Sequence, residues 1–298
     1  MARALLNAGF QGTLSAYRFG AGDPTTKLGS RGFARATLTP EGPGTLVLRW
    51  RDDDEPALDA AAYGPGADWL LDRVGAMTGA LDAGHEFVDG HPAVLHAQAR
   101  HPGLRLGASG TLYHELLPVI IAQRITAGEA LRQWHTLVWR LGEPAPGPIE
   151  GLRTPPSPER LVGLASWWFH PLGIERRRAE ALRTVARHAA NLHAWADLAP
   201  AAAGAKLRLL PGIGAWTVGS VLGPALGDPD AIAVGDYHLK HHIVFALTGR
   251  ARGTDEEMLE LLAPYAGHRG RAVRLLQLDC PAPPSFGPRH RVLPMNKW

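Results

Sequence analysis

The sequence predicts an α+β fold in which a small N-terminal α/β domain, built around a sheet, precedes a larger, all-helical domain. Residues 1 to about 63 are rich in Gly, Thr and Pro and contain short β-prone runs. From Pro65 to about residue 278, apolar residues recur at steps of three or four, which is the period of a helix with one buried face. We place the domains at 1–100 and 101–298, because 298 residues amount to about two domains of roughly 150 residues each.

The N-terminal part contains two predicted strands joined by a turn. Residues 34–39 alternate apolar and polar side chains, which predicts a strand covered on one face only. Residues 45–50 are also β-prone, and Glu41-Gly42-Pro43-Gly44 between the two runs is typical of a hairpin turn. We expect the acidic run at 52–55 to be a solvated turn.

Helical periodicity continues through most of the remaining chain. The apolar residues from Leu70 to Leu81 fall on one helical face. The proline-rich segments 144–148 and 155–158 predict an irregular crossing, and the prolines after Cys280 predict an irregular arm. Further helices are expected within 111–141, 161–164, 175–195, 201–209, 217–226, 237–247 and 255–262.

Composition excludes several classes of protein. The chain has 31 Lys and Arg against 28 Asp and Glu, and the net charge of +3 is too small to identify a polyanionic partner by itself. A single cysteine, Cys280, excludes a disulfide framework, a four-cysteine zinc site and a cysteine-ligated iron–sulfur cluster within one chain. No apolar stretch approaches the roughly 18 residues of a membrane span, and no cleavable leader is found. We therefore expect a cytoplasmic protein.

Residues 207–220 predict two helices joined by a tight turn. Pro211 cannot continue the first helix because it lacks an N–H, and Gly212 and Gly214 permit positive φ and close backbone approach. The helix that follows offers free N–H groups and the positive end of its dipole to a phosphate. A plain Pro-Gly connection without a ligand explains the same pattern.

A carboxylate stands at the start of the next predicted helix, about 20 residues beyond this turn. Asp236 lies in the sequence Gly235-Asp236-Tyr237. An aspartate at such a place most often caps the helix by accepting backbone N–H groups. Capping and catalysis are compatible, because one carboxylate oxygen can hold the N–H groups while the other faces a substrate.

Together, the two segments resemble the HhH-GPD superfamily of DNA glycosylases, which pairs Leu-Pro-Gly-Ile-Gly with a loop that ends in an aspartate at a helix start. The resemblance is strongest to the alkylpurine branch, the 3-methyladenine DNA glycosylase II type, and covers most of the chain. Supporting segments are 122–126, 172–179 and 268–272.

The resemblance implies a fold and an activity. A short mixed α/β domain would precede two helical subdomains with a base pocket between them. Such enzymes hydrolyse the N-glycosidic bond of a damaged base that has left the stack of duplex DNA. Asp236 matches the catalytic aspartate, which would stabilise positive charge on the sugar and orient or deprotonate water. The hairpin residues that would bind the DNA backbone are Gly212, Ile213, Gly214 and Thr217.

Trp216 stands where relatives with an additional lyase step carry a nucleophilic lysine, so the resemblance implies a monofunctional enzyme. Its indole could stack on the extruded base, where a cationic alkylpurine would gain about 0.5–2 kcal/mol of cation–π attraction; a core tryptophan that holds the hairpin is the alternative. Ser220 and His268 stand where the prototype has aromatic pocket residues, which leaves the substrate preference open. Trp168, next to Trp167 on a predicted helix, is a candidate wall of the base pocket or a core residue.

Gln123 and Arg124 match the stretch that supplies the wedge that fills the gap left in the duplex. The wedge residue is commonly apolar, so Arg124 could instead stack, contact a phosphate or lie in solvent. Two basic runs are expected to contact phosphates where they are not simply solvated. They comprise Arg176, Arg177, Arg178, Arg183 and Arg187, and then Arg269, Arg271, Arg274, Arg289, Arg291 and Lys297.

The resemblance requires no cofactor, but it implies a monovalent cation held by carbonyl groups of the hairpin. His238 and His242 are one helical turn apart, as two metal ligands would be. The sequence places no third ligand, so we favour surface or phosphate-contacting histidines there. The expected partner is double-stranded DNA that contains a damaged base, and the protein is expected to act as a monomer.

Two classes of function remain open. The first is a monofunctional base-excision enzyme, for alkylated purines or for another lesion such as uracil, hypoxanthine or a bulky adduct. The second is a DNA-binding protein that kept the hairpin but lost efficient catalysis. The presence of Asp236 favours the enzyme, because phosphate binding alone does not need a carboxylate.

Overall fold

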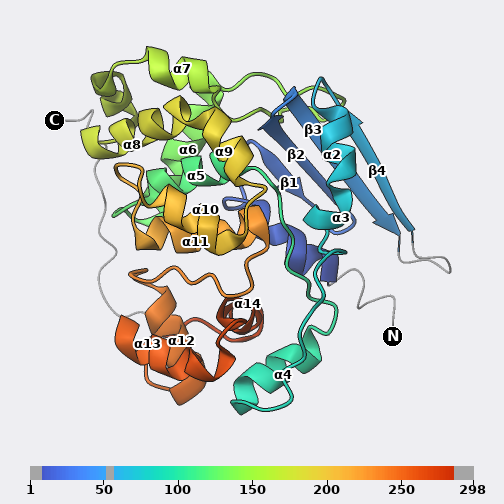
Figure 1. Cartoon of the computed structure of the whole chain (residues 1–298), viewed down its shortest axis with the longest axis vertical. Helices are drawn as coiled ribbons and strands as arrows, with labels where there is room; N and C mark the ends of the chain where they lie inside the picture. The colour runs from blue at the N-terminus through green and yellow to red at the C-terminus, as the bar shows by residue number, and fades with distance from the viewer. Residues whose placement is uncertain (1–8, 52–56, 285–298) are drawn as a thin grey trace.

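The computed structural model describes residues 9–51 and 57–284. A sheet lies on one side of the molecule, and the helices form an upper and a lower cluster (Figure 1). The predicted α+β fold class is confirmed. The acidic run at 52–55 and the basic residues Arg289, Arg291 and Lys297 lie outside the described residues.

The sheet has four antiparallel strands in the order β1-β2-β3-β4. The predicted hairpin is confirmed, but its turn lies at residues 40–41, and Gly42, Pro43 and Gly44 of the predicted turn already belong to β3. Strands β1 and β4 were not predicted, since β1 has three residues only and the alanines of β4 carry little β signal. The strands are β1 (Thr26–Leu28), β2 (Gly32–Thr39), β3 (Gly42–Arg51) and β4 (Ala57–Tyr63).

The prediction that 34–39 is covered on one face only is wrong, because both faces of β2 are buried. Ala34 and Ala36 pack with Leu152 of the irregular crossing. The polar residues Arg35 and Thr37 face the other way and are also buried. They contact polar side chains of the helical part. The alternation of polar and apolar residues in β2 therefore reflects a strand with one apolar and one polar face, both of them buried.

Arg35 is the centre of the contact between the sheet and the helices. Its guanidinium donates to Glu115 Oε1 at 2.7 Å and to the backbone carbonyl of Tyr17. Ser109 donates to the same carboxylate oxygen at 2.8 Å. Burial raises the pKa of Glu115, and the nearby Arg35 opposes that effect. A buried ion pair therefore joins β2 to the first helix of the upper cluster.

His114, the neighbour of Glu115, bridges two hydroxyl groups of the N-terminal domain. Its ring nitrogens lie 3.0 Å from Thr37 Oγ1 and 3.1 Å from Thr25 Oγ1. Complete burial, with Arg35 nearby, holds the pKa of His114 well below its usual value. The imidazole is therefore neutral, and one nitrogen can donate while the other accepts.

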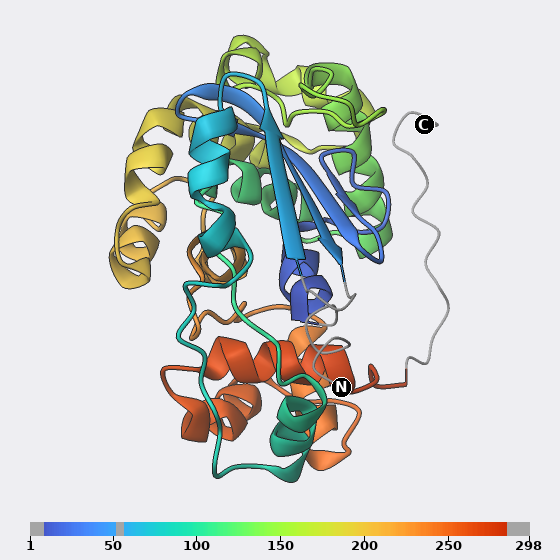
Figure 2. The same cartoon turned by 90° about the vertical axis from the view of Figure 1, so that its right-hand side faces the viewer.

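The helices form two clusters with separate hydrophobic cores, and Figure 2 shows the lower cluster beneath the sheet. The upper cluster contains α5 (Leu112–Ala122), α6 (Ala127–Leu141), α7 (Pro158–Gly163), α8 (Arg176–Arg187), α9 (Ala189–Trp195), α10 (Pro200–Leu207) and α11 (Ala215–Leu226). The lower cluster contains α4 (Pro92–Arg100), α12 (Leu239–Thr248), α13 (Asp255–Leu262) and α14 (Arg269–Asp279). The sheet side carries α2 (Ala67–Asp72), α3 (Val74–Met77) and the 3₁₀ turn η1 (Ser15–Tyr17), and two further 3₁₀ turns are η2 (Ser166–Leu172) and η3 (Ala263–Tyr265).

The structure divides three segments over which the sequence predicts a helical period. The predicted face from Leu70 to Leu81 is divided at Arg73 between α2 and α3, and Leu81 lies beyond α3 and is exposed. The run 111–141 is broken at 123–126 between α5 and α6, where Arg124 has a φ of +60°. The run 175–195 is broken at His188 between α8 and α9. Helix α4, at the end of the predicted N-terminal domain, packs on α14, so the chain reaches the lower cluster before residue 100.

Among the residues that the structure describes, every helix is too short or too polar to cross a membrane.

The buried ion pair gives a test of how the sheet is attached. Arg35→Met leaves the buried Glu115 without its cation, so we expect the free energy of unfolding to fall by about 3–5 kcal/mol. The double variant Arg35→Met/Glu115→Leu removes both charges and should regain most of this loss. Urea unfolding measures both effects, and a single variant as stable as the wild type would contradict the attachment.

Candidate active site

The hairpin between α10 and α11 is anchored to two other segments. Gly212 has a φ of +88°, and a Cβ there would lie 2.8 Å from Ala181 Cβ on α8. Gln123, at the end of α5, donates from Nε2 to Gly212 O and to Thr217 Oγ1, at 3.0 Å each. Hairpin, α8 and the loop after α5 therefore form one unit.

The predicted DNA-binding residues of the hairpin divide into two groups. Ile213 and Thr217 are buried, so their side chains hold the hairpin and do not face a ligand. Gly214 is exposed with a φ of −99°, and a Cβ there would have no neighbour within 4 Å. Both glycines permit positive φ, and only Gly212 adopts it. Gly214 instead leaves the start of α11 open to approach.

Asp236 lies just before α12 and accepts three hydrogen bonds. Its Oδ1 accepts the backbone N–H groups of His238 and Leu239, at 2.8 Å each. Its Oδ2 accepts the indole Nε1–H of Trp216 at 3.0 Å. One oxygen thus performs the capping role that the sequence predicts, and the other lies beside the residue at the lysine position of the hairpin.

Two glycines set the position of the loop that carries Asp236. A Cβ at Gly219 on α11 would lie 1.9 Å from Ile232 O, and one at Gly270 on α14 would lie 2.7 Å from Ala231 O. Both distances are impossible for a real side chain, so each glycine allows backbone-to-backbone contact. The loop is held between the upper and lower clusters, four residues before Asp236.

Asp230 fixes the same loop to α14. Arg269 donates to this carboxylate from its backbone N at 3.0 Å, from Nε at 2.8 Å and from Nη2. The Arg269 hydrogen bonds lower the pKa of Asp230. This ion pair, named here the Asp230–Arg269 clamp, therefore fixes the loop to α14 where the loop meets the lower cluster.

Asp255 supports Asp236 from the opposite side. Its Oδ1 accepts Gly235 N and its Oδ2 accepts Lys240 Nζ, at 2.9 Å each. Burial alone would raise the pKa of Asp255, but the bonds from Lys240 and Gly235 outweigh it, so the pKa is lowered. The sequence did not predict this role for Asp255. Helix α13 begins with three acidic residues, and their sequence does not show that the first of them binds a distant loop.

The other predicted pocket residues make contacts of their own. Ser220 donates from Oγ to the carbonyl of Trp216 at 2.7 Å, so it bonds to its own helix one turn away. Trp168 packs edge-to-face on Phe169 and against the upper core. The ring of His268 stacks on His85, with ring centres 3.8 Å apart. Trp216 thus contacts the predicted catalytic residue Asp236 through its indole and the predicted pocket residue Ser220 through its carbonyl.

His268 lies in a cluster that we did not predict. Phe87 meets its ring edge-to-face. Burial, followed by the neighbouring His85 and Arg271, lowers the pKa of His268. The signal for this cluster was weak, because His85 and Phe87 belong to an irregular stretch between α3 and α4.

The prediction that the basic runs contact phosphates is wrong for several residues, which pair inside the protein. Arg178 is buried and donates to Ile121 O and Gln133 Oε1. Arg183 pairs with Glu180, Arg271 pairs with Asp82, and Arg274 donates to Gly12 O. Long side chains such as arginine reach partners that sequence spacing does not reveal.

The two residues after Asp236 are exposed, and the histidines that follow form no metal-ligand cluster with other residues that the structure describes. Tyr237 is 61% exposed and accepts a bond from Arg252. His241 accepts Gly253 N through Nδ1. Among the described residues, no group of three or more His, Cys, Asp and Glu side chains could hold a metal ion.

The Asp230–Arg269 clamp gives stability a defined dependence on pH. Because the folded-state pKa of Asp230 is lowered, the clamp stabilises the protein above the unfolded pKa of about 4 and is lost as pH falls through the folded value. Arg269→Ala should therefore unfold at a lower urea concentration than the wild type at about pH 7, and the difference between the two unfolding midpoints should shrink towards about pH 3. When both proteins also carry Asp230→Asn, this difference should not depend on pH. A difference that grows on acidification would refute the clamp.

Three solved structures that superpose on most of the chain are DNA glycosylases. The 3-methyladenine DNA-glycosylase from Archaeoglobus fulgidus superposes with a TM-score of 0.72 at 19% identity, over 91% of this chain and 94% of that one. The apo 8-oxoguanine glycosylase/lyase of Clostridium acetobutylicum gives 0.57 at 12% identity, over 85% and 98%. The same enzyme with double-stranded DNA that contains cytosine opposite 8-oxoguanine gives 0.57 at 13% identity, over 84% and 95%. No family model and no curated relative matches the sequence. The chain therefore has the fold of the HhH-GPD DNA glycosylases, as its sequence resemblance predicted.

Proposed function

We propose that the protein is a monofunctional DNA glycosylase that hydrolyses the N-glycosidic bond of alkylated purines in duplex DNA. The observation that carries the proposal is the Asp236 carboxylate, which three N–H donors hold beside the hairpin. A helix cap would need only the two backbone donors. The third, from Trp216, fixes the second oxygen at the start of α11, where a DNA strand on the hairpin would arrive.

The proposed reaction begins with the damaged nucleotide extruded from the stack. The bond between C1′ and the base nitrogen breaks, and its electron pair leaves with the base. The positive charge that develops on the sugar is stabilised by the carboxylate of Asp236. Water then adds to C1′ and gives its proton to the carboxylate or to solvent. A cationic alkylated purine leaves as a neutral molecule, so it needs no proton from the protein.

The residues around Asp236 favour hydrolysis without a lyase step. Trp216 occupies the lysine position and has no nucleophilic amine. Lys240 donates to Asp255, and this bond raises the pKa of Lys240, so the ammonium group stays protonated and cannot attack the sugar. The bond to Asp236 uses only the edge of the Trp216 indole, which suits stacking of a cationic base on a ring face.

Two further proposals concern ligands. Double-stranded DNA is the proposed partner, and the protein would act as a monomer. The monovalent cation implied by the resemblance would share Leu210 O and Gly212 O, which accept Ile213 N at 3.0 Å and Gln123 Nε2 at 3.0 Å. A carbonyl oxygen has two lone pairs, so both bonds leave room for such an ion. No step of the reaction depends on it.

Release of bases from alkylated duplex DNA tests the activity. Asp236→Asn keeps the cap but removes the charge, and we expect excision to fall about 100-fold or more. Asp59→Asn, an equal change of charge on the sheet, should excise at the wild-type rate. An Asp236→Asn protein as fast as the wild type would refute the catalytic assignment.

The same assay separates the alternatives. A panel of alkylated purines, uracil, hypoxanthine and a bulky adduct identifies the substrate class. If the wild type releases none of them but binds duplex DNA, the protein is a binding module with the glycosylase fold.

The absence of a lyase step is tested on the product strand. After base release, the abasic strand should stay intact until alkali is added, and borohydride should trap no covalent complex, because Trp216 cannot form a Schiff base. A trapped complex would contradict the monofunctional assignment.

A further inference from the structure

We infer that four arginines at the corner formed by the hairpin, the loop after α5 and the start of α8 bind the sugar-phosphate backbone of duplex DNA independently of the lesion. They are Arg124, Arg176, Arg177 and Arg208, named here the arginine corner. The inference rests on the proposed function only in taking DNA as the partner. Its four residues lie outside the Asp236 loop and come from three separate segments.

The corner is rigid because hydrogen bonds and close packing join its three segments. Arg178, next to Arg177, donates to Ile121 O at 2.7 Å and so ties the first turn of α8 to the end of α5. Gln123, next to Arg124, donates to Gly212 O at 3.0 Å. Gly212 in turn packs against Ala181 of α8. Each corner arginine thus lies on an anchored stretch of backbone.

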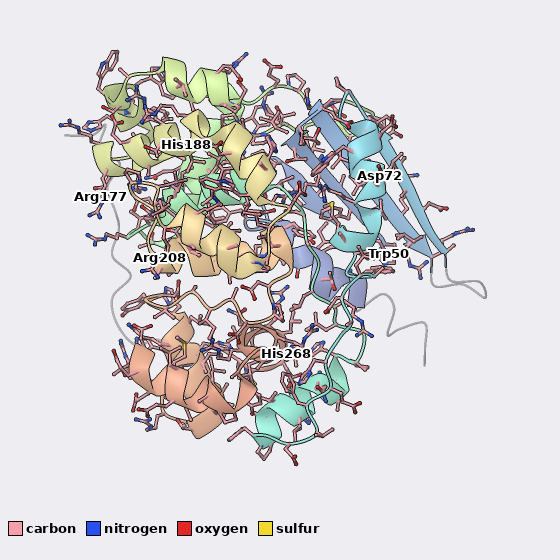
Figure 3. All side chains as sticks on the ribbon, viewed as in Figure 1. Trp50, Asp72, Arg177, His188, Arg208 and His268 are labelled. Carbon is pink, nitrogen blue, oxygen red and sulfur yellow. The ribbon has the colours of Figure 1, made fainter. Side chains whose placement is uncertain are left out.

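The charges of the corner are not neutralised within the protein. In the part of the chain that the structure describes, these four arginines are exposed and their guanidinium groups have no ion-pair or hydrogen-bond partner. The acidic residues of α8 are already engaged, since Glu175 lies 3.7 Å from buried Arg178 and Glu180 lies 3.0 Å from Arg183. Figure 3 shows Arg177 and Arg208 on the same edge of the molecule.

Two of the positions are unfavourable for stability. Arg124 is the one residue other than glycine with positive φ among those described, and the left-handed conformation costs about 1–2 kcal/mol. Arg176 and Arg177 occupy the first turn of α8, where the helix dipole disfavours cations. Strain that folding does not require is typical of sites that bind a ligand. An incoming polyanion would offset both costs.

The geometry favours a duplex backbone as this polyanion. The corner surrounds the hairpin, and the hairpin leads directly into α11 with Trp216, the partner of Asp236. A strand that reaches Asp236 therefore passes the corner. Its phosphates present a row of negative charges, which suits cations that come from three separate segments.

The salt dependence of binding to undamaged duplex DNA measures the number of phosphate contacts. Each lost contact lowers the slope of log K against log salt concentration by about 0.9. Arg177→Ala/Arg208→Ala should therefore reduce the slope by about 1.8. The matched control is Arg49→Ala/Arg140→Ala, which removes two exposed, unpaired arginines from β3 and the far end of α6. The control should retain the wild-type slope.

The outcomes separate this inference from the proposed function. Equal slopes for the test and control variants would overturn the arginine corner, even if base excision is normal. If the test variant shows the expected loss of slope but the wild type releases no base, the arginine corner is supported and the proposed glycosylase activity is contradicted. A slope reduced equally in both variants would show a general charge effect and overturn the inference.

Discussion

The close approach of two backbones on either side of the Asp236 loop is the constraint on which the site depends. Gly219 brings α11 against Ile232, and Gly270 brings α14 against Ala231. A side chain at either position would have to displace a carbonyl group, because the contacts are far shorter than van der Waals separation. The loop therefore cannot shift without parting the two helical clusters. This fixes the distance between Asp236, which enters the lower cluster, and Trp216, which belongs to the upper one.

The contact between Trp216 and Asp236 follows from this constraint and has a chemical consequence. Trp216 Nε1 lies 3.0 Å from Asp236 Oδ2 because α11 packs directly against the loop. A tryptophan offers an N–H donor and a ring face but no nucleophile, whereas a lysine at this position would bring an amine towards the same carboxylate. Under the proposed function, the side chain at this one position on α11 therefore decides whether a lyase step can follow hydrolysis.

The elements and the hairpin were largely predictable from the sequence, because their signals are local. The helical period, the Pro-Gly turn and an aspartate ahead of a helix all act within a few residues of the chain. The partners of these features were not predictable. Asp255 holds Gly235 from 20 residues away, and Gln123 reaches Gly212 from 89 residues away. The alternation in β2 was misleading for the same reason, because the partner of Arg35 is Glu115, on a helix 80 residues later.

The net charge of +3 illustrates why composition says little about a polyanion site. An arginine contributes little to binding a polyanion when a carboxylate of the protein neutralises it or when burial keeps it away from the surface. The guanidinium groups of Arg178, Arg269 and Arg271 have partners inside the protein. Arg269 and Arg271 also lie directly beside the Asp236 loop. Arginines of the same basic runs therefore have opposite roles, and only the hydrogen-bond partners distinguish them. Among the described residues, unpaired arginines also lie elsewhere, as Arg49 on β3 and Arg140 on α6 do, but four of them surround one hairpin. Several cations gathered at one corner orient a long anion, whereas isolated cations on other faces only attract it.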